Sequence, residues 1–226
     1  MVVLVVAAHP DDEVLGCGGT IARLAREGHE VHIAILGEGI TSRSRTRDEA
    51  SRVDAEALRA RAREVAKLLG GRSLLTQDLP DNRFDTVPLL DVVKVVEEWV
   101  GAIRPQVVYT HHSGDLNIDH SVVHRAVLTA TRPIAGCDIM EICAFEVPSS
   151  SEWAFGQFTK PFQPNVFVDV SETLGLKLRA MRLYETEARP FPHPRSREAL
   201  RAAALKWGSV AGLKAAEAFE LVRSIR

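Results

Sequence analysis

Residues 2–13 read VVLVVAAHPDDE, and this stretch decides the fold. The first seven of them, Val2–Ala8, form an unbroken apolar run rich in β-branched side chains, which is typical of a central parallel strand buried on both faces. Pro10 lacks a backbone N–H and disfavours a helical backbone at the residue before it, so the strand is expected to end at His9. Acidic residues follow at once, and a helix is expected over 14–27, with Asp11 or Asp12 near its N-cap.

The alternation of strand and helix continues along the chain. Apolar runs predict further strands over 30–36, 73–76, 107–110, 138–147, 165–170 and 216–222. Amphipathic periodicity predicts further helices over 48–69, 89–103, 121–131, 171–187 and 196–206. This order indicates an α/β fold, a Rossmann-like, mostly parallel sheet with helices on both faces. Because no linker or repeat divides the chain, a single domain over 1–226 is expected.

The acidic residues after the first strand present an electrostatic problem. Asp11, Asp12 and Glu13 place three negative charges within one turn, and a helix N-terminus offsets only about 0.3–1 kcal/mol for each of them. An acidic N-cap with a solvated first turn is the simplest interpretation of such a run. His9 at the strand end favours a metal site instead, because a neutral imidazole and a carboxylate are suitable ligands for zinc. Ligands of open α/β sheets also bind beyond the carboxyl ends of the strands.

A second polar stretch, HHSGDLNIDH at 111–120, follows the strand expected over 107–110. His120 and His124 are four residues apart, so they share a helix face if the helix begins early enough. No glutamate lies between them, and the zinc-protease pattern is therefore absent. Taken alone, His120 is an ordinary histidine near a helix N-terminus. Three other histidines are better explained individually as supporting or surface residues: His111, His112 and His124.

Two segments resemble the opening motif of the zinc-dependent de-N-acetylases of the PIG-L/LmbE family: AHPDDE at 8–13 and GCGGT at 16–20. Later matching segments extend the resemblance over most of the chain. The resemblance implies a zinc site, with Fe²⁺ as an alternative divalent metal, and a substrate that is an N-acetylglucosamine-type sugar or sugar conjugate. It implies the reaction as well, which is hydrolytic removal of the N-acetyl group.

The same resemblance implies the roles of individual residues. His9, Asp12 and His120 would bind the metal and leave one position open, as catalytic zinc sites do. Asp11 would be the catalytic base that takes a proton from water. Asp119 precedes His120 as an aspartate does in the second motif of the family, and it is expected to orient an imidazole from behind the metal.

The chain departs from the family pattern at Asn117. Several members have a histidine at this position, three residues before the zinc histidine, which is thought to stabilise the oxyanion or to protonate the amine. An amide can donate a hydrogen bond to an oxyanion but cannot supply a proton at neutral pH. We therefore expect Asn117 to be an oxyanion donor while Asp11 handles both proton transfers. The alternative is that His111, His112 or His124 has taken the role; otherwise, His124 is expected to support the site from behind.

Loops beyond other strand ends carry candidate substrate-binding residues. Arg43 lies in a basic loop that is either solvated or a rim for a phosphate or carboxylate of the substrate. Asn82 and Arg83 either donate to sugar hydroxyls or a phosphate, or hold their own loop together; the family resemblance favours substrate contact. The aromatic residues of 148–164 either wall a sugar cleft or form a satellite core under a loop.

Composition restricts the class of protein. The chain has 226 residues, 46% of them hydrophobic, and a net charge of −2, so nothing suggests nucleic-acid binding. No apolar stretch reaches the length of a membrane span, and a cytoplasmic protein without an anchor is expected. The three cysteines lack Cys-x-x-Cys spacing and are expected to be reduced and buried. A homo-oligomer is compatible with the sequence.

Two rival functions remain open at this level. A related zinc amidase that removes a group other than acetyl would keep the same metal site and differ around Arg43, Arg83 and the 148–164 segment. A metal-stabilised binding module without turnover would coordinate its metal with four protein ligands, which leaves no open position for water. It would also need no base at Asp11.

Overall fold

The computed structural model describes residues 1–41 and 52–226. Within these residues, seven strands form one sheet in the spatial order β3-β2-β1-β4-β5-β7-β6. The strands are β1 (Val2–Ala7), β2 (Glu30–Gly37), β3 (Ser73–Leu79), β4 (Val107–His111), β5 (Glu141–Phe145), β6 (Val166–Asp169) and β7 (Ala216–Ser224). β7 pairs antiparallel with β5 and β6, and the other neighbours pair in parallel. The expected α/β class with a mostly parallel sheet is therefore confirmed.

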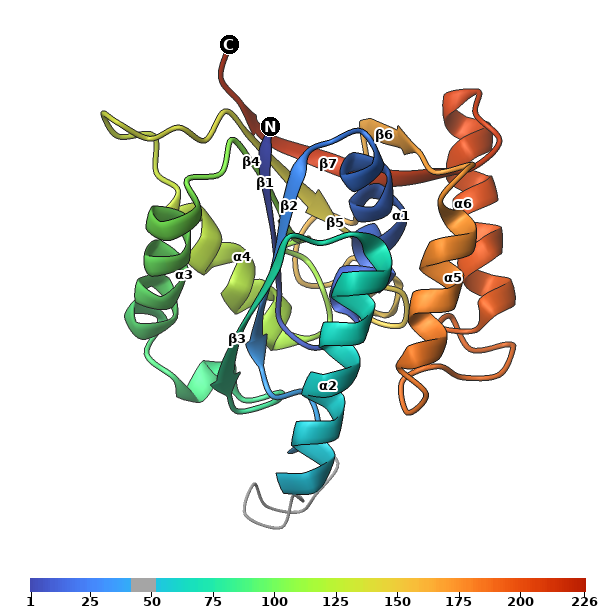
Figure 1. Cartoon of the computed structure of the whole chain (residues 1–226), viewed down its shortest axis with the longest axis horizontal. Helices are drawn as coiled ribbons and strands as arrows, with labels where there is room; N and C mark the ends of the chain where they lie inside the picture. The colour runs from blue at the N-terminus through green and yellow to red at the C-terminus, as the bar shows by residue number, and fades with distance from the viewer. Residues whose placement is uncertain (42–51) are drawn as a thin grey trace.

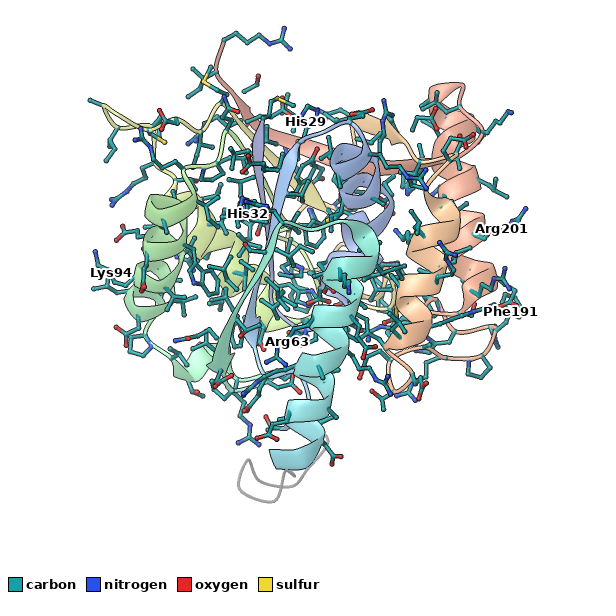
Figure 2. The ribbon with its side chains drawn as sticks, in the orientation of Figure 1. His29, His32, Arg63, Lys94, Phe191 and Arg201 are labelled. Carbon is teal, nitrogen blue, oxygen red and sulfur yellow. The ribbon has the colours of Figure 1, made fainter. Side chains whose placement is uncertain are left out.

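Helices cover both faces of this sheet (Figure 1). One face carries α3 (Leu89–Ile103) and α4 (Ile118–Ala130). The other carries α1 (Asp12–Arg26), α2 (Arg52–Leu69), α5 (Leu174–Leu183) and, beside α5, α6 (Arg197–Ala211). Figure 2 shows side chains filling the space between the helices and the sheet. No helix in the described ranges is both long enough and apolar enough to cross a bilayer.

β1 lies in the middle of this arrangement and is buried on both faces. Val3 and Val5 belong to the core under α1, α2 and α5, whereas Leu4 and Val6 belong to the core under α3 and α4. Successive side chains of a strand point to opposite faces, so a strand between two cores must be apolar at every position. The uninterrupted apolar run of β1 follows from this position.

The strand order reverses between β1 and β4. The chain builds β2 and β3 on one side of β1 and then crosses over to place β4 and β5 on the other. Open α/β sheets bind ligands at such a reversal, beyond the carboxyl ends of the strands. These ends of β2 and β3 lie at the lower side of Figure 1, and both chain termini lie at the upper side. The segments that follow β1 and β4 therefore meet at the end of the sheet opposite the termini.

Some element boundaries differ from those expected. α4 begins at Ile118 rather than at 121, because the Asn117 side chain caps it by accepting a hydrogen bond from the Asp119 N–H at 3.0 Å. β5 is restricted to Glu141–Phe145 because its parallel register covers only the five residues of β4. The first four residues of the helix expected over 48–69 lie outside the described residues. Of the cysteines, Cys17 and Cys143 are buried as expected, but Cys137 is only half-buried; all three are free.

α1 is interrupted behind the first polar segment. Cys17 has φ −144° and ψ 24°, so two helical halves meet there at a kink. The Glu217 carboxylate caps the second half by accepting hydrogen bonds from the N–H groups of Gly19 and Thr20 at 2.9 and 2.7 Å. Lys177 donates to the same carboxylate at 2.6 Å, and this ion pair is buried. The kink is therefore a supported feature of the fold, and it lets the first half of α1 take its own direction beside the sheet.

Gly16 allows this half of α1 to approach β5. A Cβ at position 16 would overlap the ring of Phe145, whereas a Cβ at Gly101 in α3 would meet nothing within 4 Å. We expect Gly16→Ala to lower the free energy of unfolding by about 1–3 kcal/mol through overpacking. The matched change Gly101→Ala is expected to raise it by about 0.5–1 kcal/mol, because alanine is the better helix former. Urea unfolding measures both, and a Gly16→Ala variant as stable as wild type would contradict the close approach.

Candidate metal centre

Two polar segments, from the ends of β1 and β4, bring His9, Asp12 and His120 together. His9 Nδ1 lies 3.3 Å from Asp12 Oδ2, and His120 Nε2 lies 3.3 Å from the same oxygen. Each residue can place one ligand atom within 4.8 Å of the others, and all three side chains are buried. Three buried donors of this kind meet at the edge of the sheet where the fold binds ligands.

The donor spacing suits a divalent cation. Two ligands roughly 2.1 Å from a tetrahedral metal lie roughly 3.4 Å apart, which is close to both measured distances. His120 Nε2 is buried and makes no hydrogen bond within the part of the chain that the structure describes. A buried, unpaired ring nitrogen is costly unless a ligand such as a metal satisfies it. His9, Asp12 and His120 therefore fit a metal with one position left open.

The electrostatics of the site point in the same direction. Burial alone would lower the pKa of His120, but the carboxylates of Asp12 and Asp115 raise it to about 9. Burial alone would raise the pKa of Asp12, but His120 and His9 hold it well below its ordinary value. Carboxylates thus draw protons onto the imidazoles of His120 and His9. A divalent cation would replace these protons and neutralise the same negative charge.

His9 is oriented by carboxylates on its other side. His9 Nε2 donates to Asp119 Oδ2 at 2.9 Å and lies 3.3 Å from Asp81 Oδ1. Asp119 also accepts a hydrogen bond from the Phe84 N–H at 2.9 Å. His9, Asp81 and Asp119 form a second group with metal-ligand spacing, but the proton on Nε2 occupies the nitrogen that this group would need. With this proton on Nε2, Nδ1 is the His9 nitrogen left to bind a metal beside Asp12, and the Asp119 carboxylate contacts the imidazole from the opposite side.

His120 has an orienting carboxylate of its own, which the sequence analysis missed. His120 Nδ1 lies 3.2 Å from Asp115 Oδ2, although out of line for a hydrogen bond. Burial raises the pKa of Asp115, but His120 and two serine hydroxyls lower it to about 2. An ionised carboxylate on the far nitrogen leaves Nε2 as the ligand atom of His120. The signal in the sequence was an aspartate five residues before the histidine, which no general ligand pattern includes.

The remaining histidines near the site have structural partners. His111 Nε2 accepts a hydrogen bond from the Ala8 N–H at 2.8 Å, so this nitrogen has no lone pair for a metal. The His111 ring also stacks on His120, with centroids 4.0 Å apart. His124 Nδ1 donates to the carbonyl of His111 at 2.8 Å, and His112 Nδ1 lies 2.6 Å from Glu220 Oε2. Both His120 and His124 lie in α4, as an early start of the helix requires.

Asp11 lies next to the three donors without belonging to them, on a strained backbone. Its φ of 122° is rare for a residue with a side chain and costs about 1–3 kcal/mol, a cost that often marks a functional site. The Asp11 N–H donates to Glu13 Oε2 at 3.0 Å, and Tyr184 donates to the other oxygen of Glu13 at 2.7 Å. Glu13 and Tyr184 thus hold the turn that presents Asp11.

Arg195, which the sequence analysis did not single out, contacts the Asp11 carboxylate. Arg195 Nη1 donates to Asp11 Oδ2 at 2.7 Å. Burial raises the pKa of Asp11 well above its ordinary value even though Arg195 opposes this shift. Arg195 ends the segment 189–195, which contains three prolines and is non-helical. Figure 2 shows Phe191 of this segment at the outer edge of the molecule, beside α5 and α6.

The remaining predicted residues lie around the same end of the sheet. Asn117 uses its side-chain oxygen to cap α4, so only its amide nitrogen is left to donate elsewhere. Asn82 donates from Nδ2 to Asp81 Oδ1 at 2.9 Å and so supports the loop that faces His9. Arg83 precedes a short 3-10 helix, η3 (Phe84–Thr86), and is half-buried. Arg43 lies outside the described residues.

Comparison with known proteins identifies the family. The PIG-L family model, described as GlcNAc-PI de-N-acetylase, matches residues 4–131, more than half of the chain. Diacetylchitobiose deacetylase of Thermococcus kodakarensis is 30% identical over 240 residues, covering 99% of this chain and 84% of that protein. The 1D-myo-inositol 2-acetamido-2-deoxy-alpha-D-glucopyranoside deacetylase of Actinosynnema mirum is 28% identical over 237 residues, covering 81% of this chain and 80% of that protein.

A solved structure supports the fold. The zinc-inhibited form of teicoplanin deacetylase Orf2 superposes with a TM-score of 0.77 over 99% of both chains, at 14% identity. The family match spans the segments after β1 and β4 that carry His9, Asp12 and His120. The chain therefore belongs to the PIG-L family and is an N-deacetylase.

Proposed function

We propose that the protein is a divalent-metal-dependent hydrolase that removes the N-acetyl group from an N-acetylglucosamine-type sugar or sugar conjugate. The observation that carries this proposal is the buried triad His9, Asp12 and His120 with a fourth buried residue, the acidic Asp11, beside it but outside the donor set. The printed names of the two relatives support the class of substrate, since both describe deacetylation of an acetamido sugar.

The residues of the chain divide the chemistry among them. When bound, a divalent metal supplies Lewis acidity toward water and the amide carbonyl. Asp11 takes a proton from the attacking water as the water oxygen bonds to the carbonyl carbon. Asp11 then returns that proton to the amide nitrogen as the carbon–nitrogen bond breaks, which leaves the free amine and acetic acid; the acid loses its remaining water-derived proton to become acetate. His9, Asp12 and His120 would hold the metal, with Zn²⁺ or Fe²⁺ as the candidates.

Asp11 is suited to both proton transfers. Burial raises its pKa above the ordinary value, and the Arg195 guanidinium opposes this shift and favours the carboxylate form. A single group that receives a proton and returns it needs no second acid. A single acid–base group is needed in this chain because Asn117, which cannot supply a proton, occupies the position where several family members have a histidine.

A serine at position 117 separates the two roles of Asn117. Serine caps helices about as well as asparagine, so the free energy of unfolding of Asn117→Ser should stay within a few tenths of a kcal/mol of wild type. If the Asn117 amide donates to the oxyanion, its loss should lower kcat about 10²–10³-fold, because a serine hydroxyl engaged in the cap is too short to replace it. Metal content should not change. Wild-type turnover in Asn117→Ser would leave this residue as a helix cap alone.

We also propose that Arg43, Asn82 and Arg83 contact the substrate beyond its acetamide group. Asn82 and Arg83 follow β3 at the same end of the sheet as the donor triad, and arginine suits a phosphate or carboxylate on the sugar conjugate. One N–H of the Asn82 side-chain amide already donates to Asp81. A contact with the substrate would therefore come from the amide oxygen or from the second N–H.

The proposal is tested by measuring release of free amine and acetate by the Zn²⁺- or Fe²⁺-loaded protein. The panel should contain N-acetylglucosamine, N,N′-diacetylchitobiose and glycosides of N-acetylglucosamine, each beside its N-propionyl counterpart. Faster release from the acetyl compounds supports the proposal. Preference for a larger acyl group would identify a related amidase, and metal binding without release from any of these compounds would contradict the proposed class of substrate.

A further inference from the structure

Three consecutive serines follow β5 in the segment that the sequence analysis singled out only for its aromatic residues. They are Ser149, Ser150 and Ser151, and they lie just before the 3-10 helix η4 (Glu152–Ala154). Each hydroxyl of this serine run contacts a charged side chain that leads into the metal centre. The contacts divide into two branches.

The first branch leads to a metal-binding histidine. The hydroxyls of Ser150 and Ser151 donate to the two oxygens of Asp115, the latter at 2.7 Å. Asp115 Oδ2 in turn lies 3.2 Å from His120 Nδ1. Asp115 and Ser150 are only 3% and 5% exposed, so the carboxylate cannot turn toward water to satisfy its oxygens. The two hydroxyls hold the carboxylate at a fixed position against the His120 ring.

The second branch leads to the base. The Ser149 hydroxyl accepts a hydrogen bond from Arg195 Nε at 2.8 Å, and Arg195 Nη1 donates to Asp11 at 2.7 Å. Ser149 has φ +73°, a left-handed conformation that residues with side chains seldom adopt. Its N–H donates to Glu152 Oε1 at 2.7 Å, which supports this turn. The planar guanidinium therefore binds the serine run through Nε and Asp11 through Nη1. Because the group is rigid, the position of the loop fixes the position of the Asp11 carboxylate.

We propose that the Ser149–Ser151 run is a positioning element of the catalytic site. Ser150 and Ser151 fix His120 through Asp115, and Ser149 fixes Asp11 through Arg195. The second branch rests on the proposed function, whereas the first concerns metal binding alone. One short loop after β5 thus aligns a metal ligand and the base, which come from segments far apart in the chain.

The first branch is tested with Zn²⁺ and Co²⁺ as the probes. Residues that support a metal ligand from behind typically contribute about 10–100-fold to metal affinity, and we expect Ser150→Ala to weaken Zn²⁺ binding about tenfold. The visible absorption of the Co²⁺-loaded variant should also change, because the His120 ring is free to tilt. The matched control is Ser121→Ala, which removes a neighbouring hydroxyl that donates to the carbonyl of Ser113 and does not touch Asp115.

The second branch is tested by separating kcat from metal affinity. Ser149→Ala should bind Zn²⁺ like wild type and leave KM unchanged, while kcat falls about tenfold. Arg195→Lys should behave in the same way, because an ammonium group cannot form the same fork between Ser149 and Asp11. Urea unfolding of each variant shows whether the substitution also lowers the free energy of unfolding, as general damage to the loop would.

The outcomes separate this inference from its rivals. Wild-type Zn²⁺ affinity and Co²⁺ spectrum in Ser150→Ala, or an equal loss in Ser121→Ala, would overturn it. Parallel losses of metal affinity and kcat in both Ser149→Ala and Ser150→Ala would overturn it too, since they would reduce the serine run to an anchor of its loop. A wild-type protein that binds Zn²⁺ but hydrolyses no acetamido sugar would refute the proposed function, and the Ser150 measurements would still decide the inference.

Discussion

Replacing His9, Asp12 or His120 with alanine is expected to abolish tight metal binding and to reduce amide hydrolysis below detection. The three side chains supply the converging donors, and the two donor separations of 3.3 Å suit a single tetrahedral cation, so loss of any one side chain removes one of its ligands. Each change also leaves a buried imidazole or carboxylate without its partner, which adds a desolvation cost. Metal analysis of the purified variants and calorimetric titration with Zn²⁺ measure the effect.

Thermal unfolding with and without a chelator gives a second measurement that needs no substrate. A ligand at 100 times its Kd stabilises the folded state by about 2.7 kcal/mol, so a chelator should lower the Tm of the wild type and leave the three variants unmoved. His29→Ala is a suitable control, because His29 lies near the N-terminus, at the upper end of the molecule in Figure 2. Full zinc occupancy in His120→Ala would remove His120 from the ligand set.

Asp11→Asn is expected to keep its metal and lose most of its turnover. Asparagine has nearly the size of aspartate and tolerates positive φ, so the strained turn at φ 122° should survive. An amide cannot accept and return a proton at neutral pH, and a positioned base contributes about 10²–10⁴-fold to the rate. Steady-state kinetics with saturating Zn²⁺ measure the turnover, and metal analysis of the same sample measures the bound zinc.

The result for Asp11→Asn has two informative alternatives. Near-normal turnover would assign the proton transfers to another group, with His111, His112 and His124 as the candidates that the sequence offers. Loss of zinc together with activity would make Asp11 a ligand rather than a base. The structure supports a base, since Asp11 is directed toward Arg195 and is not one of the three grouped donors.

Features that depend on neighbours in the chain were predictable from the sequence. A short apolar run rich in β-branched residues favours a strand between two cores, and His-Pro after it favours the end of that strand, so β1 and its polar end followed from local rules. The helix 89–103 was predicted with the boundaries that the structure shows, because its apolar periodicity stops at Pro105. The pairing of the first motif with His120 came from the family resemblance, not from spacing.

By itself, the sequence determined the fold class and the central position of β1, and it predicted a metal site at the end of that strand, because strand burial, helix periodicity and the His-Pro-Asp-Asp motif all depend on neighbouring residues. Only the tertiary structure decided which residues support that chemistry. Asp11 meets Arg195 across 184 positions, and Asp115 meets Ser150 across 35. Partners of this kind are brought together by the crossing of the chain at the end of the sheet. The residues next to a loop serine or arginine in the sequence do not show whether its side chain makes such a contact or is exposed to solvent.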